Sequence, residues 1–175
     1  CEVRVIGITG SNGKTTVKNL LAGILQQVAP TLATPGNFNN ELGLPLTLCQ
    51  LNKQHRFAVL EMGARQAGDI EVLTAMAAPS VGIVTNAGPA HLETFGDIAG
   101  VAKAKGEMFS ALAADGVAIL NADDDFSGEW RLRCGERKVI SFGRHELADV
   151  RSDCTGPACR IKTPKGDFDT HLRLH

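Results

Sequence analysis

The sequence feature that most constrains the fold is a glycine-rich octapeptide, Thr-Gly-Ser-Asn-Gly-Lys-Thr-Thr, at residues 9–16. Residues 3–9 form an apolar run typical of a buried strand, and residues 15–28 have the apolar periodicity of a helix. A strand, a glycine-rich turn and a helix in this order predict a phosphate-binding loop. The general pattern has glycine where Ile8 stands, so Gly10 serves in a shorter form of the loop. The apolar positions of the predicted helix are Val17, Leu20, Leu21, Ile24, Leu25 and Val28.

The chemistry of this loop predicts that it binds ATP with Mg²⁺. Glycines let successive backbone N–H groups turn toward a phosphate, and the positive end of the following helix favours an anion. Lys14 is expected to reach the outer phosphates, and the Thr15 hydroxyl to ligate magnesium. An incidental glycine-rich turn would need neither the lysine nor the two threonines at the start of a helix. The predicted nucleotide-binding residues of the loop are Gly10, Ser11, Asn12, Gly13, Lys14, Thr15 and Thr16.

Short apolar runs alternate with helical patterns along most of the chain. The alternation predicts an α/β fold: a P-loop-type, mostly parallel sheet with helices on both faces. After residue 143 no helical pattern is left, and a turn signal between two extended runs predicts a C-terminal β-hairpin. The predicted strands are 3–9, 57–61, 81–85, 116–120 and 138–142; the helices are 15–28, 69–78 and 97–113; the hairpin pairs 159–163 with 168–174 across 164–167.

Two residues at the carboxyl ends of predicted strands are candidates for the metal site. Glu61 ends the strand at 57–61, and ligands of open parallel sheets bind outside the carboxyl ends of the strands. Glu61 is therefore predicted to ligate magnesium, directly or through water, although a solvated glutamate at a strand end is the simpler alternative. His91 lies in the loop after the next strand, where it could bind a second metal, touch a phosphate or be merely exposed.

Lys105 is predicted to point into the protein. It lies on the apolar stripe of the helix at 97–113, three and four residues after Ala102 and Val101. Lys103 falls off that stripe, where a solubilising lysine belongs. An inward lysine either extends its amine to the rim of the helix or serves a site. Burial lowers the pKa of a lysine, so Lys105 could take up carbon dioxide and become a carbamate, whose oxygens suit magnesium.

Composition and charge restrict the other functions that the chain could have. Its 175 residues suffice for one domain with a real core, and a net charge of -1 gives no basic footprint for nucleic acid. The apolar runs are shorter than the ~20 residues that a membrane span needs. The cysteines are odd in number and scattered, and Cys154 and Cys159 have no partner pair at zinc spacing. We expect reduced thiols and a cytoplasmic protein.

Five segments together resemble the central domain of the Mur ligases. They are residues 9–16, the Gly-Asn-Phe-Asn-Asn-Glu-Leu-Gly-Leu-Pro run at 36–45, Leu-Glu-Met-Gly-Ala at 60–64, Ala-His-Leu-Glu at 90–93 and Val-Ala-Lys-Ala-Lys-Gly-Glu-Met-Phe at 101–109. In this family ATP phosphorylates the terminal carboxylate of a muramyl peptide, and an incoming amine then displaces phosphate. Within the family, the segments are most similar to the member whose substrates are UDP-N-acetylmuramoyl-tripeptide and D-alanyl-D-alanine.

The resemblance also implies a domain organisation and roles for individual residues. Residues 1–175 would be the central ATP-binding domain, incomplete at its C-terminal end, with the N-terminal UDP-substrate domain and the C-terminal domain absent from this chain. Asn37 or Asn40 would face the nucleotide or the acyl phosphate, and the resemblance does not choose between them. The implied catalytic residues are Lys14, His91 and Lys105, and the implied metal ligands are Thr15, Glu61, His91 and Lys105 as a carbamate.

Two alternatives remain at this level. Another ligase of the superfamily, such as the tripeptide-forming muramyl ligase or folylpolyglutamate synthase, would have a similar core. A P-loop binding module of another class, such as a GTPase, would need a guanine-specifying Asn-Lys-x-Asp sequence. Residues 121–125 read Asn-Ala-Asp-Asp-Asp, without that lysine.

Overall fold

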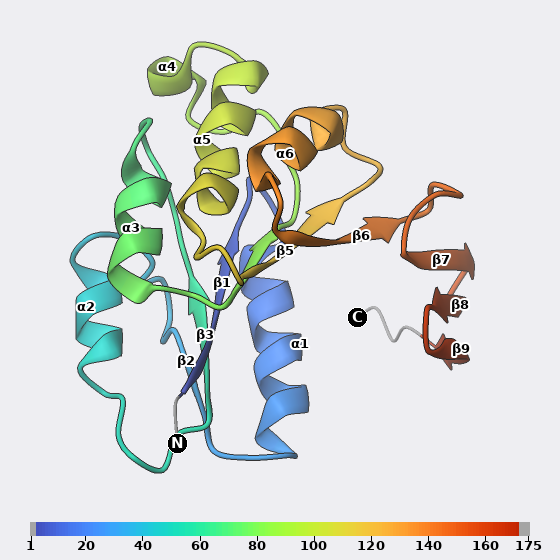
Figure 1. Cartoon of the computed structure of the whole chain (residues 1–175), viewed down its shortest axis with the longest axis horizontal. Coiled ribbons are helices and arrows are strands. Elements are labelled where there is room, and N and C mark those ends of the chain that lie inside the picture. Colours follow the sequence, from blue (N-terminus) through green and yellow to red (C-terminus); the bar gives the residue numbers. More distant parts are fainter. Residues whose placement is uncertain (1–2, 172–175) are drawn as a thin grey trace.

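The computed structural model describes residues 3–171, which form one continuous nine-stranded sheet and the helices packed on it (Figure 1). The strand order is β2-β3-β1-β4-β5-β6-β7-β8-β9. Neighbours from β2 to β7 pair in parallel, and the pairs β7–β8 and β8–β9 are antiparallel. The strands are β1 (Arg4–Thr9), β2 (Thr31–Ala33), β3 (Phe57–Glu61), β4 (Val81–Val84), β5 (Val117–Asn121), β6 (Lys138–Gly143), β7 (Val150–Thr155), β8 (Ala158–Thr163) and β9 (Gly166–His171).

Helices cover both faces of the parallel part of the sheet, as Figure 1 shows for α1 on one side and α3 and α5 on the other. Successive strand residues point to opposite faces. Val59 therefore packs in the core beneath α1, whereas Ala58 and Leu60 belong to the core shared with the helices of the opposite face. The helices are α1 (Lys14–Gln26), α2 (Gly43–Leu48), α3 (Asp69–Ala77), α4 (Leu92–Phe95), α5 (Ile98–Ala111) and α6 (Ser127–Cys134).

The predicted α/β architecture is confirmed, and each predicted strand and helix of the parallel part is present within two residues of its expected ends. Five elements were not predicted: β2, α2, α4, α6 and β7. These elements are short, or their buried residues do not follow the regular spacing from which a helix or a strand is predicted. In α6 only Trp130 and Cys134 are buried, and the rest of that helix is polar or exposed. Between residues 3 and 171, no helix is long and apolar enough to cross a membrane.

The predicted apolar stripe of α1 is only partly correct. Val17, Leu21 and Leu25 pack against the sheet, but Leu20, Ile24 and Val28 are 64%, 62% and 75% exposed. The apolar residues of α1 extend around more of the helix than the one side that packs against the sheet. The fully buried side chains of α1 are instead Lys18 and Ala22, so a lysine occupies a position in the core.

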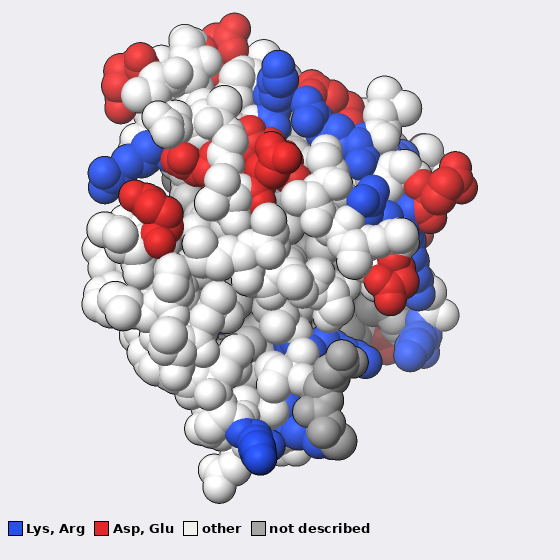
Figure 2. All heavy atoms as spheres, turned by 60° about the vertical axis from the view of Figure 1, so that its left-hand side comes forward, with Lys and Arg blue, Asp and Glu red and all other residues white. Residues whose placement is uncertain are grey.

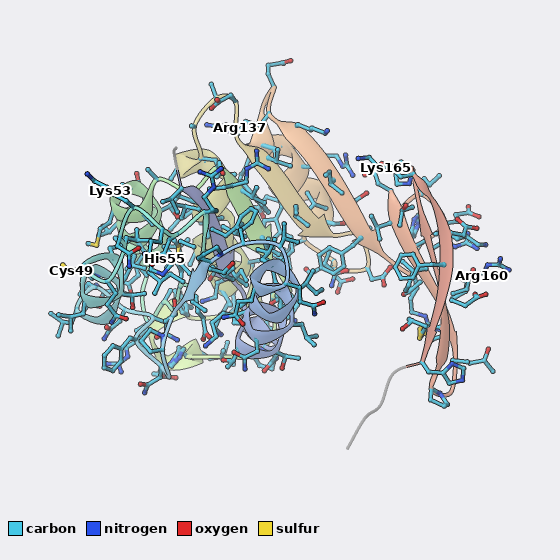
Figure 3. The ribbon with its side chains drawn as sticks, turned by 90° about the horizontal axis from the view of Figure 1, so that it is seen from below. Cys49, Lys53, His55, Arg137, Arg160 and Lys165 are labelled. Atoms are coloured by element: carbon cyan, nitrogen blue, oxygen red, sulfur yellow. A yellow bond between two sulfur atoms is a disulfide. The ribbon has the colours of Figure 1, made fainter. Side chains whose placement is uncertain are left out.

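The C-terminal hairpin is confirmed as β8 and β9, and residues 172–174 of its predicted second strand lie outside the described part. The strand β7 joins it, so β7–β9 form an antiparallel extension that projects beyond the helices (Figure 3). The prediction of reduced thiols is wrong for two cysteines. Register places Cys154 opposite Cys159 on β7 and β8, and the two form a disulfide. Cys49 and Cys134 are free thiols.

Candidate nucleotide-binding site

Three parallel strands end at the same edge of the sheet and bring the predicted site residues together there. Strand β1 lies between β3 and β4, with Ile8 beside Glu61 and Thr9 beside Val84. The glycine-rich loop that follows β1 therefore emerges next to Glu61 on one side and next to the loop after β4 on the other. This edge is the carboxyl end of the strands, where open α/β sheets bind their ligands.

The glycine-rich loop is fastened to the loop after β4 by reciprocal hydrogen bonds. The Ser11 hydroxyl donates to the Gly88 carbonyl (3.1 Å) and accepts from the Gly88 N–H (2.9 Å). The Asn12 N–H donates to Asn86 Oδ1 (3.0 Å), and Asn86 Nδ2 donates to the Asn12 carbonyl (3.1 Å). The Thr85 hydroxyl donates to the same Asn12 carbonyl (2.7 Å). These contacts fix the loop before any ligand binds.

Two glycines of the loop have backbone angles that other residues rarely adopt. Gly10 has a φ of 141° and Gly13 a φ of 79°. Gly13 is the residue before α1, so the first N–H groups of the helix, which have no partner inside it, point outward at the loop. The Lys14 ammonium donates to the carbonyls of Gly10 (2.7 Å) and Ser11 (3.1 Å). Burial lowers the pKa of Lys14, and nearby Glu61 opposes that shift.

Glu61 is buried at the end of β3, with both carboxylate oxygens hydrogen-bonded. The Thr15 hydroxyl donates to Oε2 and Asn39 Nδ2 donates to Oε1, each at 2.9 Å. The backbone N–H of Glu61 donates to the Thr34 hydroxyl (2.9 Å), at the residue that follows β2. The structure thus excludes the simpler alternative of a solvated glutamate, and it brings the two predicted metal ligands Thr15 and Glu61 into contact.

Two residues of this cluster were missed by sequence reasoning. Lys18 is buried at 3% exposure, with Nζ 3.7 Å from Glu61 Oε2. Asn39, between the two asparagines singled out from the sequence, is the one that reaches Glu61. A signal for Lys18 was available: it lies next to Val17 and three residues before Leu21, the same inward placement that identified Lys105. No comparable signal separates Asn39 from its neighbours.

Lys105 points into the protein, as predicted, and is 3% exposed on α5. Its ammonium lies 5.7 Å from the centre of the Phe95 ring. Burial, and secondly the charge of Lys14, lower the pKa of Lys105 to about 8, while Glu107 and Asp69 act in the opposite direction. An amine with this pKa is still mostly protonated at pH 7, but its neutral fraction is far larger than that of a lysine with the ordinary pKa of 10.5, and the neutral form is the one that the carbamate hypothesis requires.

The three predicted catalytic residues line one cavity of about 820 Å³. Lys14 and Lys105 reach it from the helices α1 and α5, and His91 from the loop before α4, where its φ is 52°. His91 is exposed, and its Nδ1 lies 3.7 Å from Glu93 Oε1. Gly10, Ser11, Asn37 and Asn40 also line the cavity. The other predicted residues of the loop, Asn12, Gly13, Thr15 and Thr16, are exposed outside it, and the buried Glu61 is not one of its lining residues.

The two asparagines between which the sequence could not choose differ in their contacts. Asn40 Oδ1 accepts hydrogen bonds from the backbone N–H groups of Leu42 (3.3 Å) and Gly43 (2.9 Å), at the start of α2. The Asn40 side chain therefore has a structural task in holding that helix end. Asn37 lines the cavity from the same loop.

The donor set of this edge fits magnesium with a polyphosphate. Thr15 and Glu61 offer oxygen atoms, which Mg²⁺ prefers. Within residues 3–171 no three His, Cys, Asp or Glu side chains gather as a metal cluster. Proteins usually bind Mg²⁺ through one or two carboxylates, and waters and substrate phosphates supply the other ligands. The Lys14 ammonium donates to two carbonyls of the glycine-rich loop and lines the cavity, and a cation at that position favours an anionic ligand.

On the face drawn in Figure 2, acidic and basic side chains alternate in the upper part, and the lower left has few charges. The exposed apolar residues Leu46, Val72 and Met76 belong to α2 and α3, on the side that is turned forward in that view.

The comparisons with known proteins agree with this geometry. The Mur ligase middle domain family matches residues 8–174. The UDP-N-acetylmuramoyl-tripeptide–D-alanyl-D-alanine ligase of Escherichia coli (strain K12) is 41% identical over 98% of this chain and 39% of its own length. A crystal structure of MurF from Acinetobacter baumannii matches 98% of the chain and 39% of its own, with a TM-score of 0.92 and 38% identity. MurF ligase from Thermotoga maritima, solved in complex with ADP, matches 97% of the chain and 40% of its own, with a TM-score of 0.85 and 31% identity.

These matches extend over almost the whole chain, which spans about two fifths of the length of the relatives. The family match includes the glycine-rich loop, Glu61 and Lys105, whose arrangement was derived above from the contacts alone. The chain belongs to the Mur ligase middle domain family.

Proposed function

We propose that this chain is the ATP-binding part of a ligase that joins D-alanyl-D-alanine to UDP-N-acetylmuramoyl-tripeptide, a step of peptidoglycan precursor synthesis. The observation behind the proposal is the contact between Thr15 and Glu61 beside the P-loop, next to Lys14, which lines one cavity together with Lys105 from α5. The identity to the Escherichia coli relative, which has that ligase name, supports the choice of substrates. Because ATP is its phosphoryl donor, we place the reaction in the cytoplasm.

Each residue of the site has a task in this proposal. ATP, when bound, supplies the phosphoryl group that activates the carboxylate of the tripeptide. Lys14 leaves the carbonyls of Gly10 and Ser11, which occupy it in this structure, and neutralises the outer phosphates. The backbone N–H groups at the start of α1 hold phosphate oxygens. Thr15 and Glu61 would hold magnesium, whose charge would offset that of the phosphates.

The opposite wall of the cavity would serve the reacting carboxylate. We propose that Lys105 acts as a carbamate, which replaces a cation near the phosphates by an anion with two oxygen donors for a second magnesium. His91 would support that second magnesium or the acyl phosphate. Asn37 is our choice for the contact to the nucleotide or acyl phosphate, because the oxygen of Asn40 already caps α2.

The nucleotide site is tested by calorimetric titration of this chain with ADP and MgCl₂. Lys14→Ala should weaken binding roughly 10- to 100-fold, because a charge-assisted contact to phosphate is lost. The fold should persist, since Lys14 stands at the mouth of the cavity and not in the core. Equal affinity of the two proteins would contradict the proposed site, and tighter binding of GDP than of ADP would favour a switch protein instead.

The ligase activity is tested in a chimera, because this chain spans only part of the relatives' length. This chain replaces the matching segment of the Escherichia coli ligase, and phosphate release is measured with UDP-N-acetylmuramoyl-tripeptide. Release should require D-alanyl-D-alanine and should be lost in the chimera with Lys14→Ala. Release that responds to a single amino acid instead of the dipeptide would assign the chain to another ligase of the superfamily.

A further inference from the structure

A buried ammonium lies behind the carboxylate that we propose for magnesium. Lys18 is in the middle of α1, on the side that faces the sheet, and is 3% exposed. Its Nζ donates to the Thr34 carbonyl at 2.9 Å and lies 3.7 Å from Glu61 Oε2. Removing a charged group from water is costly unless it is paired and hydrogen-bonded. Lys18 therefore places a paired charge at a core position that an apolar residue could occupy.

The Thr34 residue connects this pair to the end of β3. Its carbonyl accepts from Lys18, its hydroxyl accepts from the backbone N–H of Glu61, and its own N–H donates to the Val59 carbonyl (3.0 Å). One residue at the end of β2 thus fixes both members of the ion pair. If the Glu61 carboxylate moved, the Lys18 ammonium could stay beside it only by losing its hydrogen bond to the Thr34 carbonyl.

The carboxylate is fixed in orientation by donors on both oxygens. Asn39 donates to Oε1, and the Thr15 hydroxyl donates to Oε2, the same oxygen that faces Lys18. Rotation of the carboxylate would break the Asn39 and Thr15 contacts together and move Oε2 away from the ammonium. Lys18 therefore favours the one orientation in which Oε2 points at the hydroxyl of Thr15.

Lys18 does not face the ligand cavity. Among the described residues that line it, the lysines are Lys14 and Lys105. Lys18 lies one helical turn deeper than Lys14, with Glu61 between its ammonium and the Thr15 hydroxyl. Lys18 is therefore placed to act on nucleotide binding through Glu61 rather than through a contact to phosphate.

We propose that Lys18 is a positioning residue that holds Glu61 Oε2 at the Thr15 hydroxyl and so builds the magnesium site before metal and nucleotide arrive. The inference rests on the proposed function, since it presumes that Glu61 and Thr15 serve magnesium. Second-layer groups that orient metal ligands commonly contribute 10- to 100-fold to metal affinity. The role requires both the charge of Lys18 and its fixed place at Thr34.

The test is a double-mutant cycle on this chain, read as ADP affinity by calorimetry with MgCl₂ and again with EDTA. Lys18→Met should weaken ADP binding with MgCl₂ by about tenfold, and binding in EDTA by less than about twofold. Glu61→Gln should also reduce only the affinity measured with magnesium. The double variant should match Glu61→Gln alone, because a residue that acts through Glu61 has no effect once that carboxylate is gone.

A matched control is Lys53→Met. Lys53 is exposed in the loop before β3, at the opposite end of that strand from Glu61, and is labelled in Figure 3. It should leave both affinities unchanged. Near-ultraviolet circular dichroism of Trp130, which is fully buried, checks that each variant is folded.

Several outcomes would overturn the proposal. Lys18 also repels a divalent cation, so a purely electrostatic role would make Lys18→Met strengthen binding with MgCl₂. Equal loss of affinity in MgCl₂ and EDTA would mean that Lys18 contacts the nucleotide or only supports the fold. If Lys18→Met is unfolded, the double variant, which leaves no buried charge unpaired, is compared with Glu61→Gln. Equal affinity of these two in EDTA supports the role, and a further loss in the double variant refutes it.

The ADP affinities of the variants also distinguish a failure of the positioning role from a failure of the proposed function. If Lys14→Ala binds ADP as tightly as the unchanged protein, the nucleotide site itself is wrong. If Lys14→Ala fails to bind and Lys18→Met is indistinguishable from the unchanged protein, the site stands and only the positioning role is wrong.

Discussion

Three lysines at one edge of the sheet differ in how each side chain is held, although they are the same residue. The Lys14 ammonium donates to two carbonyls of its own loop, and that of Lys18 is paired with Glu61. The Lys105 amine lies against the Phe95 ring and has a pKa of about 8. A free amine near neutral pH is nucleophilic, so Lys105 is the lysine suited to covalent modification by carbon dioxide.

We predict that Lys105 forms a carbamate. After equilibration with ¹³C-labelled carbon dioxide, the chain should show a carbamate signal in its ¹³C spectrum that Lys105→Met abolishes. At a fixed carbon dioxide pressure the signal should grow as the pH rises through about 8, because the neutral amine is the reacting form. Lys103→Met removes an exposed lysine of the same helix and should leave the signal intact. The α-amino group also reacts with carbon dioxide, so the hypothesis would end if the spectrum of Lys105→Met kept every carbamate signal of the unchanged protein.

The same pKa predicts a contribution to stability in the chain free of carbon dioxide. The lysine in an unfolded chain keeps its proton to its ordinary pKa of 10.5, whereas the folded protein releases it at about 8. Between these values the unfolded state binds more protons, so this group favours the folded state increasingly as the pH rises. The difference in unfolding free energy between the unchanged protein and Lys105→Met should follow that direction in urea titrations from pH 8 to 10. A difference that is constant or falls with pH would contradict it.

At the scale of elements, Arg137 joins the C-terminal ends of α5 and α6. Arg137, labelled in Figure 3, follows α6 and donates to the carbonyls of Ser110, Leu112 and Ala113 at the end of α5. It also donates to the Cys134 carbonyl at the end of α6. The last carbonyls of a helix have no partner within it, and a cation there is favourable. Arg137 therefore fixes the helix that carries Lys105.

We predict that Arg137→Met lowers the free energy of unfolding by about 1–3 kcal/mol, because several carbonyls lose a charged donor. Urea unfolding followed by the fluorescence of Trp130 measures the loss, since this single tryptophan is buried between α5 and α6. Arg137→Lys should be intermediate, as an ammonium lacks the planar fork of the guanidinium. Arg131→Met, at an exposed position of α6, is the control and should change little. Equal stability of the two methionine variants would contradict this role.

At the scale of the whole molecule, the helix-covered sheet and the β7–β9 extension differ in how they are stabilised. The parallel strands are buried between helices, whereas the extension is mostly exposed and is crossed by the disulfide of Cys154 and Cys159. The nucleotide site is built entirely from the first part. In the proposed cytoplasmic location, thiols are kept reduced, so the site must form without that bond.

We predict that reduction loosens only the extension. With dithiothreitol, amide hydrogen exchange should become faster in β7 and β8, because a constraint between paired strands is lost. The affinity for ADP with MgCl₂ and the urea midpoint reported by Trp130 should stay the same. The double change of Cys154 and Cys159 to serine should reproduce the reduced protein. A fall in ADP affinity on reduction would show that extension and site are coupled.

The sequence by itself determined the class of fold and the long elements, and it predicted the lysines and the histidine that line the cavity, since these depend on local patterns. The glycine-rich loop between an apolar strand and a helix gave Lys14 and Thr15, and the stripe of α5 gave the inward Lys105. The tertiary structure decided which side chains of β2, β3 and α1 meet. The residues that contact Glu61 and Lys18 are 16 to 46 positions away from them in the sequence. Asn39 was missed for that reason, whereas the inward placement of Lys18 could be predicted from the pattern of α1 and only its pairing with Glu61 needed the tertiary structure. The same reason explains the disulfide, because only the pairing register of β7 and β8 places Cys154 opposite Cys159.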